Sequence, residues 1–242
     1  MIYSKESALS FSSCDEIVRI SHEQGFISAG LLANNNSTYY DNGVRGGRVC
    51  FIDYNKLDIA LIKPVIDTIS EYKLVNPVSI DDYSFQVAEY NAGDIGFKWH
   101  TDDRMYPSLI SGRKLTAIFE LSGADEYTGG QLEISEISPN LNIGPPMNMR
   151  NTNINSVESN LNVVYHPVQY INQDPPTVDP TSNNNTVQEI NIYTSSLNLA
   201  TISKKGKGDC IIFPSFLFHR VTPIASGTRY SLTVWCKGPM WS

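Results

Sequence analysis

The sequence predicts an α+β fold, mainly β, in which a barrel of two sheets is supported by N-terminal helices and carries a long insertion. The start of the chain holds two segments whose apolar residues recur at helical spacing. From residue 83 onward the chain changes to short runs of β-branched and aromatic residues, bounded by Gly, Pro or Asp. Several such strands after a helical start favour a double-sheet barrel.

The helical start holds two expected helices with one strand between them. CDEIVRISHEQG, residues 14–25, has amphipathic spacing and closes on a glycine, which is a common helix stop. Residues 31–47 are rich in Asn, Ser and Gly and predict a loop. RVCFIDY, residues 48–54, predicts a strand. Residues 57–74 show helical spacing again, and Pro64 should kink this second helix or mark an early turn.

The strands of the barrel are expected in YSFQVAEY, KLTAIFELS, GQLEISE, GDCIIFPS and RYSLTVWC. Residues 137–198 interrupt them with repeated prolines and a run of asparagines. A stretch this long without clear elements is usually a functional lid or a disordered insertion. Its tyrosines suit a lid that folds over a binding site and helps to select substrate, namely Tyr165, Tyr170 and Tyr193. Decoration of the outside of the barrel, or an oligomer contact, is an equal alternative.

The length fits one domain with an insertion as well as it fits two domains, because 242 residues can bury one sizeable core. We expect a single domain over residues 1–242, with helical support in residues 1–75 and the barrel core in residues 76–242. The formal net charge is -7, and an acidic chain lacks the electrostatic footprint of a nucleic-acid binder. No nucleic-acid partner is therefore expected.

Membrane and secretory signals are not found in the sequence. No run approaches the ~20 consecutive apolar residues of a membrane span, so we expect no membrane partner. The N-terminal residues lack the apolar run of a secretory signal. The four cysteines form no CxxC pair, which argues against zinc-ribbon and thioredoxin sites. A reducing, cytoplasmic location is the expectation.

The segment GFKWHTDD carries the strongest chemical signal. His100 and Asp102 are two residues apart, and in a strand such positions point to the same face. With His219 as a third ligand they would form the two-histidine, one-carboxylate triad of non-haem iron(II) oxygenases. A lone His-x-Asp is more often a strand end at the surface, so its weight comes from its surroundings. His22 is expected to be solvated, and His166 to be structural or substrate-facing.

Arg229 lies ten positions after His219 and opens the strand RYSLTVW. Its side chain would share one face of that strand with Ser231, Thr233 and Trp235. An arginine fork binds a carboxylate through two hydrogen bonds and always stays charged, which suits a dicarboxylate deep in a barrel. A surface ion pair is the ordinary alternative for a lone arginine.

Four blocks of sequence, in this order, resemble the prolyl 4-hydroxylase-like branch of the iron(II)/2-oxoglutarate dioxygenases. They are EYNAGDIGFKWHTDD, KLTAIFELS, EYTGGQLEI and GDCIIFPSFLFHRVTPIASGTRYSLTVW. The resemblance covers about residues 83–136 and 200–238 and is greatest to bacterial and phage members; GVRGGRVCFID also looks like the family's N-terminal support. It implies a double-stranded β-helix, which is a jelly-roll barrel.

The resemblance also implies roles for individual residues. His100, Asp102 and His219 match the iron ligands, and Arg229 matches the residue that pairs with the distal carboxylate of 2-oxoglutarate. Further positions match residues that line the co-substrate pocket, namely Tyr90, Thr233 and Trp235. For Tyr90 and Trp235, packing in the core is the alternative role. The turn at Gly129 and Gly130 matches a turn of the family, where the role is backbone geometry.

Two departures from the family pattern stand out. The family usually joins the GGQLEI and GDCIIFP strands by a short connection, whereas residues 137–198 intervene here. Some members also place a tyrosine or lysine for the co-substrate on the strand that spans residues 115–122 here. This chain offers Thr116, Ile118 and Glu120 on one face, and which of them contacts 2-oxoglutarate is left open.

The activity implied by the resemblance is hydroxylation of a substrate carbon with Fe(II), 2-oxoglutarate and O2, releasing succinate and carbon dioxide; a role for ascorbate is left open. The presence of Asp102 favours hydroxylation over halogenation, because related halogenases lack this carboxylate. Four aromatic residues are expected as dry walls of the site, namely Phe97, Trp99, Phe213 and Trp235.

The expected substrate is a peptidyl proline, in a peptide or a protein. A free amino acid or small metabolite is the first alternative, because substrate choice lies in loops. A nucleic-acid demethylase is opposed by the acidic charge. A non-catalytic metal-binding barrel is the alternative from a different class.

Overall fold

The structure is a computed structural model, and it describes residues 2–32, 38–54, 57–103, 111–135, 199–201 and 205–239. The predicted insertion, residues 137–198, lies outside the described residues. The expectation of a lid with Tyr165, Tyr170 and Tyr193, and that of a structural or substrate-facing His166, fall there too.

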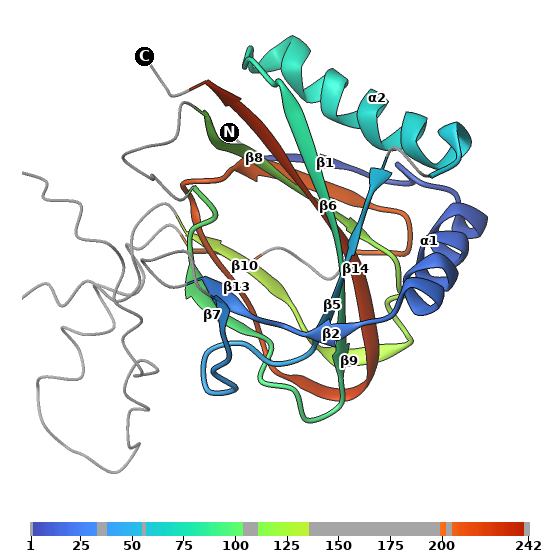
Figure 1. The fold of residues 1–242 in the computed structure, drawn as a ribbon, viewed down its shortest axis with the longest axis vertical. Helices are drawn as coiled ribbons and strands as arrows, with labels where there is room; N and C mark the ends of the chain where they lie inside the picture. The colour runs from blue at the N-terminus through green and yellow to red at the C-terminus, as the bar shows by residue number, and fades with distance from the viewer. Residues whose placement is uncertain are drawn as a thin grey trace, which may run out of the picture.

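Two antiparallel sheets form the barrel (Figure 1). The major sheet has eight strands, in the spatial order β1 (Tyr3–Lys5), β12 (Cys210–Pro214), β8 (Ser111–Glu120), β14 (Ile224–Pro239), β6 (Asp82–Asn91), β5 (Arg48–Ile52) and β2 (Ile27–Ser28), with β9 (Tyr127–Gly129) paired to the start of β14. The minor sheet has four, in the order β11 (Leu199–Thr201), β10 (Leu132–Ser135), β13 (Phe218–Val221) and β7 (Phe97–His100).

The expected strands are present, but several short strands were not predicted, among them β1, β2, β9 and β13. Each of the five expected barrel strands is present, and the strand expected at residues 48–54 is β5. Residues 31–47, predicted as a loop, contain a small ladder of β3 (Leu31–Leu32) and β4 (Thr38–Tyr39). Two-residue strands are too short to produce an alternating pattern, so a prediction from periodicity passes over them.

Helix α1 runs from Phe11 to Gln24 and ends where it was predicted to end. The hydroxyl of Ser10 accepts a hydrogen bond from the backbone N–H of Ser13 at 3.1 Å, which caps the first turn. Gly25 ends the helix at a φ of 90°, a value that favours glycine. The helix buries one face through residues spaced three and four apart, namely Cys14, Ile17 and Ser21.

Helix α2 runs from Ile59 to Val75 and passes through Pro64 without interruption. Of the two expectations for Pro64, its place in an early turn of the helix is the one the structure has. Pro64 lies in the second turn, where the missing N–H leaves only the carbonyl of Ala60 without its helical partner. The Thr68 hydroxyl donates to the carbonyl of Pro64 at 2.8 Å. The buried face holds Leu61, Val65, Thr68, Ile69 and Tyr72.

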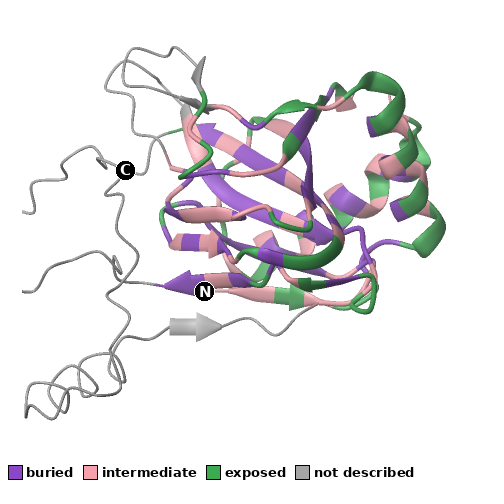
Figure 2. Ribbon diagram, turned by 90° about the horizontal axis from the view of Figure 1, so that it is seen from below, coloured by how far each residue is buried: buried purple, intermediate pink, exposed green. Residues whose placement is uncertain are grey.

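The major sheet is buried on both faces. Both helices lie against its outer face, on the side away from the minor sheet (Figure 1). On β14, Leu232, Val234 and Cys236 belong to the core cluster that also includes residues of α1 and α2. The alternate residues, such as Arg229 and Trp235, point between the two sheets. Figure 2 shows buried residues along the strands and exposed residues on the outer sides of the helices.

Within the described part of the chain, no helix has the length and apolar character that crossing a membrane requires.

Candidate metal centre and pocket

Two neighbouring strands of the minor sheet bring the predicted triad together. His100 ends β7 and His219 lies in β13, and the two residues are direct partners in the antiparallel register. Asp102 lies just past the end of β7, not within the strand as expected, and its N–H donates to the carbonyl of Ser215 at 2.8 Å. All three are buried, and one ligand atom from each lies within 4.8 Å of the others.

Backbone carbonyls fix the orientation of both imidazoles. Nδ1 of His100 lies 2.7 Å from the carbonyl of Lys98, and Nδ1 of His219 lies 3.0 Å from the carbonyl of Leu217. A carbonyl can only accept, so Nδ1 carries the proton in both rings and each Nε2 presents a lone pair. Burial and the neighbouring His219 lower the pKa of His100 to about 3, so its ring is neutral, as a metal ligand must be.

The carboxylate of Asp102 faces both Nε2 atoms. Its Oδ2 lies 3.3 Å from Nε2 of His219, and its Oδ1 lies 3.8 Å from Nε2 of His100. Burial alone would raise the pKa of Asp102, but His219, His100 and Arg113 hold it well below its usual value. The Thr116 hydroxyl donates to Oδ2 at 2.8 Å and fixes the carboxylate plane. The three side chains thus present two nitrogen donors and an ionised carboxylate at one point.

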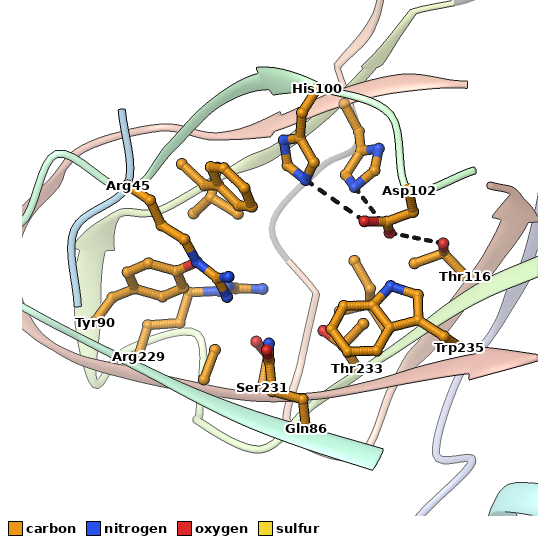
Figure 3. Close-up of a pocket in the computed structure, with 15 residues that line it drawn as sticks. Arg45, Gln86, Tyr90, His100, Asp102, Thr116, Arg229, Ser231, Thr233 and Trp235 are labelled. Carbon is orange, nitrogen blue, oxygen red and sulfur yellow. Dashed lines mark hydrogen bonds and ion pairs between the residues drawn. The ribbon is translucent and has the colours of Figure 1, made fainter. Parts of the chain in front are cut away.

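The triad stands at one side of a pocket between the two sheets, which holds about 430 Å³ of space including its opening (Figure 3). The residues predicted to line a co-substrate pocket all line this one, namely Tyr90, Arg229, Thr233 and Trp235. Ser231 lines it from the same face of β14, as the alternation predicts. Of the three open candidates on β8, Thr116 and Ile118 line the pocket, and Glu120 contacts Arg229.

Arg229 is buried at 1% exposure and is not a surface arginine. Its Nη2 donates to Oε2 of Glu120 at 2.8 Å. Burial alone would lower the pKa of Arg229, but Glu120 and Tyr127 raise it, so the guanidinium keeps its charge. Gly130 packs against the arginine stem, where an added Cβ would come within 3.1 Å of Cδ. The turn geometry predicted for this glycine also makes room for Arg229.

Three buried N–H donors without a partner in the described part of the chain belong to the pocket, namely Nε of Arg45, Nε of Arg229 and Nε1 of Trp235. Buried donors are nearly always satisfied in native proteins. Their concentration here indicates a ligand rich in acceptor oxygens, and a dicarboxylate has that character.

Of the four aromatic residues expected to form walls of the site, only two line the pocket. Phe97 and Trp235 line the pocket, and the Phe97 ring stacks on His100 with centroids 3.6 Å apart. Phe213 packs edge-on against His219 and supports that ring from outside the pocket. Trp99 does not line it, because its ring lies under the guanidinium of Arg220, 5.0 Å away.

The sequence prediction missed Arg45 and Gln86, both of which line the pocket. Gln86 lies on β6 with Tyr90, so the alternation along that strand was a usable signal. Arg45 lies in the segment before β5, and nothing in the sequence pattern links it to the triad.

Comparison with known families agrees with this geometry. A sequence profile described as the 2OG-Fe(II) oxygenase superfamily matches residues 85–237. The chain belongs to this superfamily. It is a 2-oxoglutarate-dependent dioxygenase, and Fe(II), 2-oxoglutarate and O2 are the cofactors that its family implies. No curated protein matches the sequence.

Several solved structures share the fold. A prolyl-4-hydroxylase from Pseudomonas putida gives a TM-score of 0.58 at 14% identity, over 99% of this chain and 93% of the other. A prolyl hydroxylase from Trichoplax adhaerens, in complex with a peptide fragment of the hypoxia inducible factor oxygen degradation domain, gives 0.56 at 16% identity, over 97% and 82%. SnoK, a non-heme alpha ketoglutarate dependent carbocyclase from nogalamycin biosynthesis, gives 0.55 at 10% identity, over 96% and 78%. The jelly-roll prediction is confirmed.

Proposed function

We propose that His100, Asp102 and His219 bind Fe(II) in this dioxygenase and that Arg229 binds the far carboxylate of 2-oxoglutarate. One observation carries the proposal: two oriented imidazoles and one ionised carboxylate converge in a pocket that also holds a buried, charged arginine. This donor set is that of non-haem iron(II) oxygenases, and an arginine fork suits a carboxylate.

Residues of the chain itself orient the co-substrate and exclude water from the site. When bound, the iron ion supplies the oxygen activation that couples decarboxylation of 2-oxoglutarate to hydroxylation of a substrate carbon. Tyr90 and Thr233 line the space beside Arg229 and orient the co-substrate. Phe97 and Trp235 provide apolar walls that exclude water. Asp102 occupies the third ligand position, which favours hydroxylation over halogenation.

We propose a peptidyl proline as the substrate, in a peptide or protein. Support comes from the likeness of the fold to two prolyl hydroxylases, one of them solved with a peptide fragment. A free amino acid or small metabolite is the second candidate, because SnoK, a carbocyclase, matches the fold with a TM-score of 0.55, only slightly lower than those of the two prolyl hydroxylases.

We further propose that the protein works in a reducing compartment, the cytoplasm. All four cysteines are free and buried. Burial raises the pKa of Cys14 to about 11 and that of Cys236 to about 12, so these thiols stay protonated and inert.

The full-length chain supplied with Fe(II), 2-oxoglutarate, O2 and a library of proline-containing peptides tests this function. We expect succinate to form and mass spectrometry to show the gain of one oxygen on proline. His100→Ala and His219→Ala each leave too few ligands, so both products should disappear while the circular dichroism spectrum is kept. His22→Ala is the matched control, because His22 is exposed on α1 and bonds Tyr230.

Each alternative gives a distinct result. Full turnover in either triad variant would overturn the iron site. Oxygen gained by a free amino acid and by no peptide would transfer the activity to the second candidate substrate class. Absence of succinate with every substrate tested would contradict the proposed co-substrate site.

A further inference from the structure

The ion pair beside the pocket is a poor carboxylate site on its own. Arg229 and Glu120 are joined at 2.8 Å, and their side chains are 2% and 8% exposed. A carboxylate that approaches the guanidinium therefore also approaches the negative charge of Glu120. Like charges repel strongly where water is excluded. The pair as a whole is close to neutral and attracts an anion weakly.

A second arginine, Arg45, lies in the same pocket. Its residue exposure is 9%, and its guanidinium carbon lies 4.6 Å from the centroid of Phe97, the ring that stacks on His100. In Figure 3 its side chain reaches into the pocket toward the ring of Tyr90 and the end of Arg229. Arg45 therefore lies beside Arg229 and against the ring that stacks on His100.

The backbone around Arg45 is held firmly against β7. Arg45 forms a bridge with Phe97, and the N–H of Gly46 donates to the carbonyl of Gly96 at 2.8 Å. The N–H of Lys98 donates to the carbonyl of Val44 at 3.0 Å. The backbone of Arg45 is thus positioned by the strand that carries His100, and Phe97 of the same strand contacts the guanidinium.

Arg45 is poorly satisfied by the described residues. None of their carboxylates makes an ion pair with it. Its Nη1 reaches the carbonyl of Gly30 at 3.4 Å, a long hydrogen bond, and its Nε has no partner among them. A buried guanidinium in this condition is costly unless an anion completes the site.

We propose that Arg45 is a second cationic contact for the far carboxylate of 2-oxoglutarate and offsets the charge of Glu120. Two arginines and one glutamate leave one net positive charge, which matches one carboxylate. The inference rests on the proposed function, because it takes 2-oxoglutarate as the pocket's ligand. It adds a binding residue from outside the barrel strands.

Binding of two dianions to the full-length, Mn(II)-loaded chain tests the inference, measured by isothermal titration calorimetry without oxygen. Oxalate can chelate the metal but lacks the far carboxylate, whereas 2-oxoglutarate has both ends. We expect Arg45→Gln to weaken 2-oxoglutarate binding at least tenfold and to change oxalate binding less than twofold. Arg45→Lys keeps the charge and should recover part of the loss.

Arg19→Gln is the control. Arg19 is an exposed arginine of α1 that pairs with Glu16 and Glu23, so neither ligand should be affected. Thermal unfolding of each variant shows whether it is folded. If Arg45→Gln is unfolded, Arg45→Lys and Arg45→Met carry the same comparison.

The outcomes separate the inference from the proposed function. Equal binding of 2-oxoglutarate by the wild type and Arg45→Gln, or an equal loss for both ligands, would overturn the role of Arg45. Failure of the wild type to bind 2-oxoglutarate while it still binds oxalate would instead contradict the proposed co-substrate site.

Discussion

Thr116 contacts the proposed metal site through Asp102 and is not itself one of the proposed ligands. Its hydroxyl donates to Oδ2 of Asp102 at 2.8 Å and lies 3.0 Å from the hydroxyl of Ser215. The backbone carbonyl of Ser215 in turn accepts a hydrogen bond from the backbone N–H of Asp102. The three residues form one network that holds the carboxylate toward the two imidazoles. Such outer partners are commonly worth about 10- to 100-fold in metal affinity.

We therefore expect Thr116→Val to weaken Fe(II) binding by about 10- to 100-fold while the fold is kept, because valine has a similar shape without the hydroxyl. Competition with a chelator under anaerobic conditions measures the affinity. Thr128→Val is the control, since Thr128 is exposed on β9 and bonds Ser226. An unchanged affinity would mean that backbone contacts alone orient Asp102.

We expect Glu120 to have opposite effects on the stability of the protein and on the binding of 2-oxoglutarate. Glu120→Gln leaves the buried Arg229 without its counter-ion, so we expect the free energy of unfolding to fall by on the order of 2 kcal/mol. The same change removes a negative charge beside the co-substrate, so 2-oxoglutarate should bind more tightly. Thermal unfolding with and without 2-oxoglutarate measures both effects. Weaker binding would indicate that Glu120 acts chiefly by orienting Arg229.

At the scale of elements, the contact between β7 and β13 depends on a glycine. Gly96 precedes β7 at a φ of 73°, and an added Cβ would lie 2.2 Å from the carbonyl oxygen of Val221 in β13. Neither backbone oxygens nor a positive φ can easily accommodate alanine. Since these two strands carry His100 and His219, any shift between them separates the two proposed metal ligands.

Gly96→Ala should thus lower both the free energy of unfolding, by about 2 kcal/mol or more, and the affinity for Fe(II). Chemical denaturation and metal titration measure the two quantities. Gly112→Ala is the matched control, because Gly112 lies in β8 with no atom within 4 Å of an added Cβ. A stable Gly96→Ala variant with normal metal affinity would show that β7 can move without disturbing the triad.

Strands were predictable from the sequence where residues of two kinds alternate over a long run, because the alternation assigns each residue to a face. β14 alternates core residues with pocket residues, so its sequence indicated both the strand and the face that carries Arg229 and Trp235. The exact place of Asp102 was not predictable, because the end of β7 is set by pairing with β13, which lies far along the chain. Arg45 was missed for the same reason, since only its bridge to Phe97 brings it to the site.

At the scale of the molecule, one core cluster joins the two helices to the major sheet. Ile17 of α1 and Ile69 of α2 are buried in the same cluster as Phe119 of β8 and Val234 of β14. Neither helix buries its apolar face without the sheet, and the sheet's outer face needs both helices. We therefore propose that residues 1–242 fold as one domain, not as a helical unit beside a barrel.

If residues 1–242 form one domain, we expect the protein to unfold in a single cooperative transition. Far-ultraviolet circular dichroism follows the helices and strands, while tryptophan fluorescence follows the barrel through Trp99 and Trp235, and the two curves should coincide. A loss of helical signal before the change in fluorescence would show that residues 1–75 unfold as a separate unit.

The pairing of β10 with β11 has a consequence for how such proteins can diverge. Ser135 and Leu199 are partners in this ladder, so the chain leaves the minor sheet and returns to it at adjacent points. The entropic cost of closing a loop rises by only about 0.6 kcal/mol for each doubling of its length. A longer or shorter segment between these two strands therefore adds little to the cost of closing the loop, while the strand pairing itself stays the same. A change in the length of this connection can thus leave the proposed ligands His100, Asp102 and His219 in place.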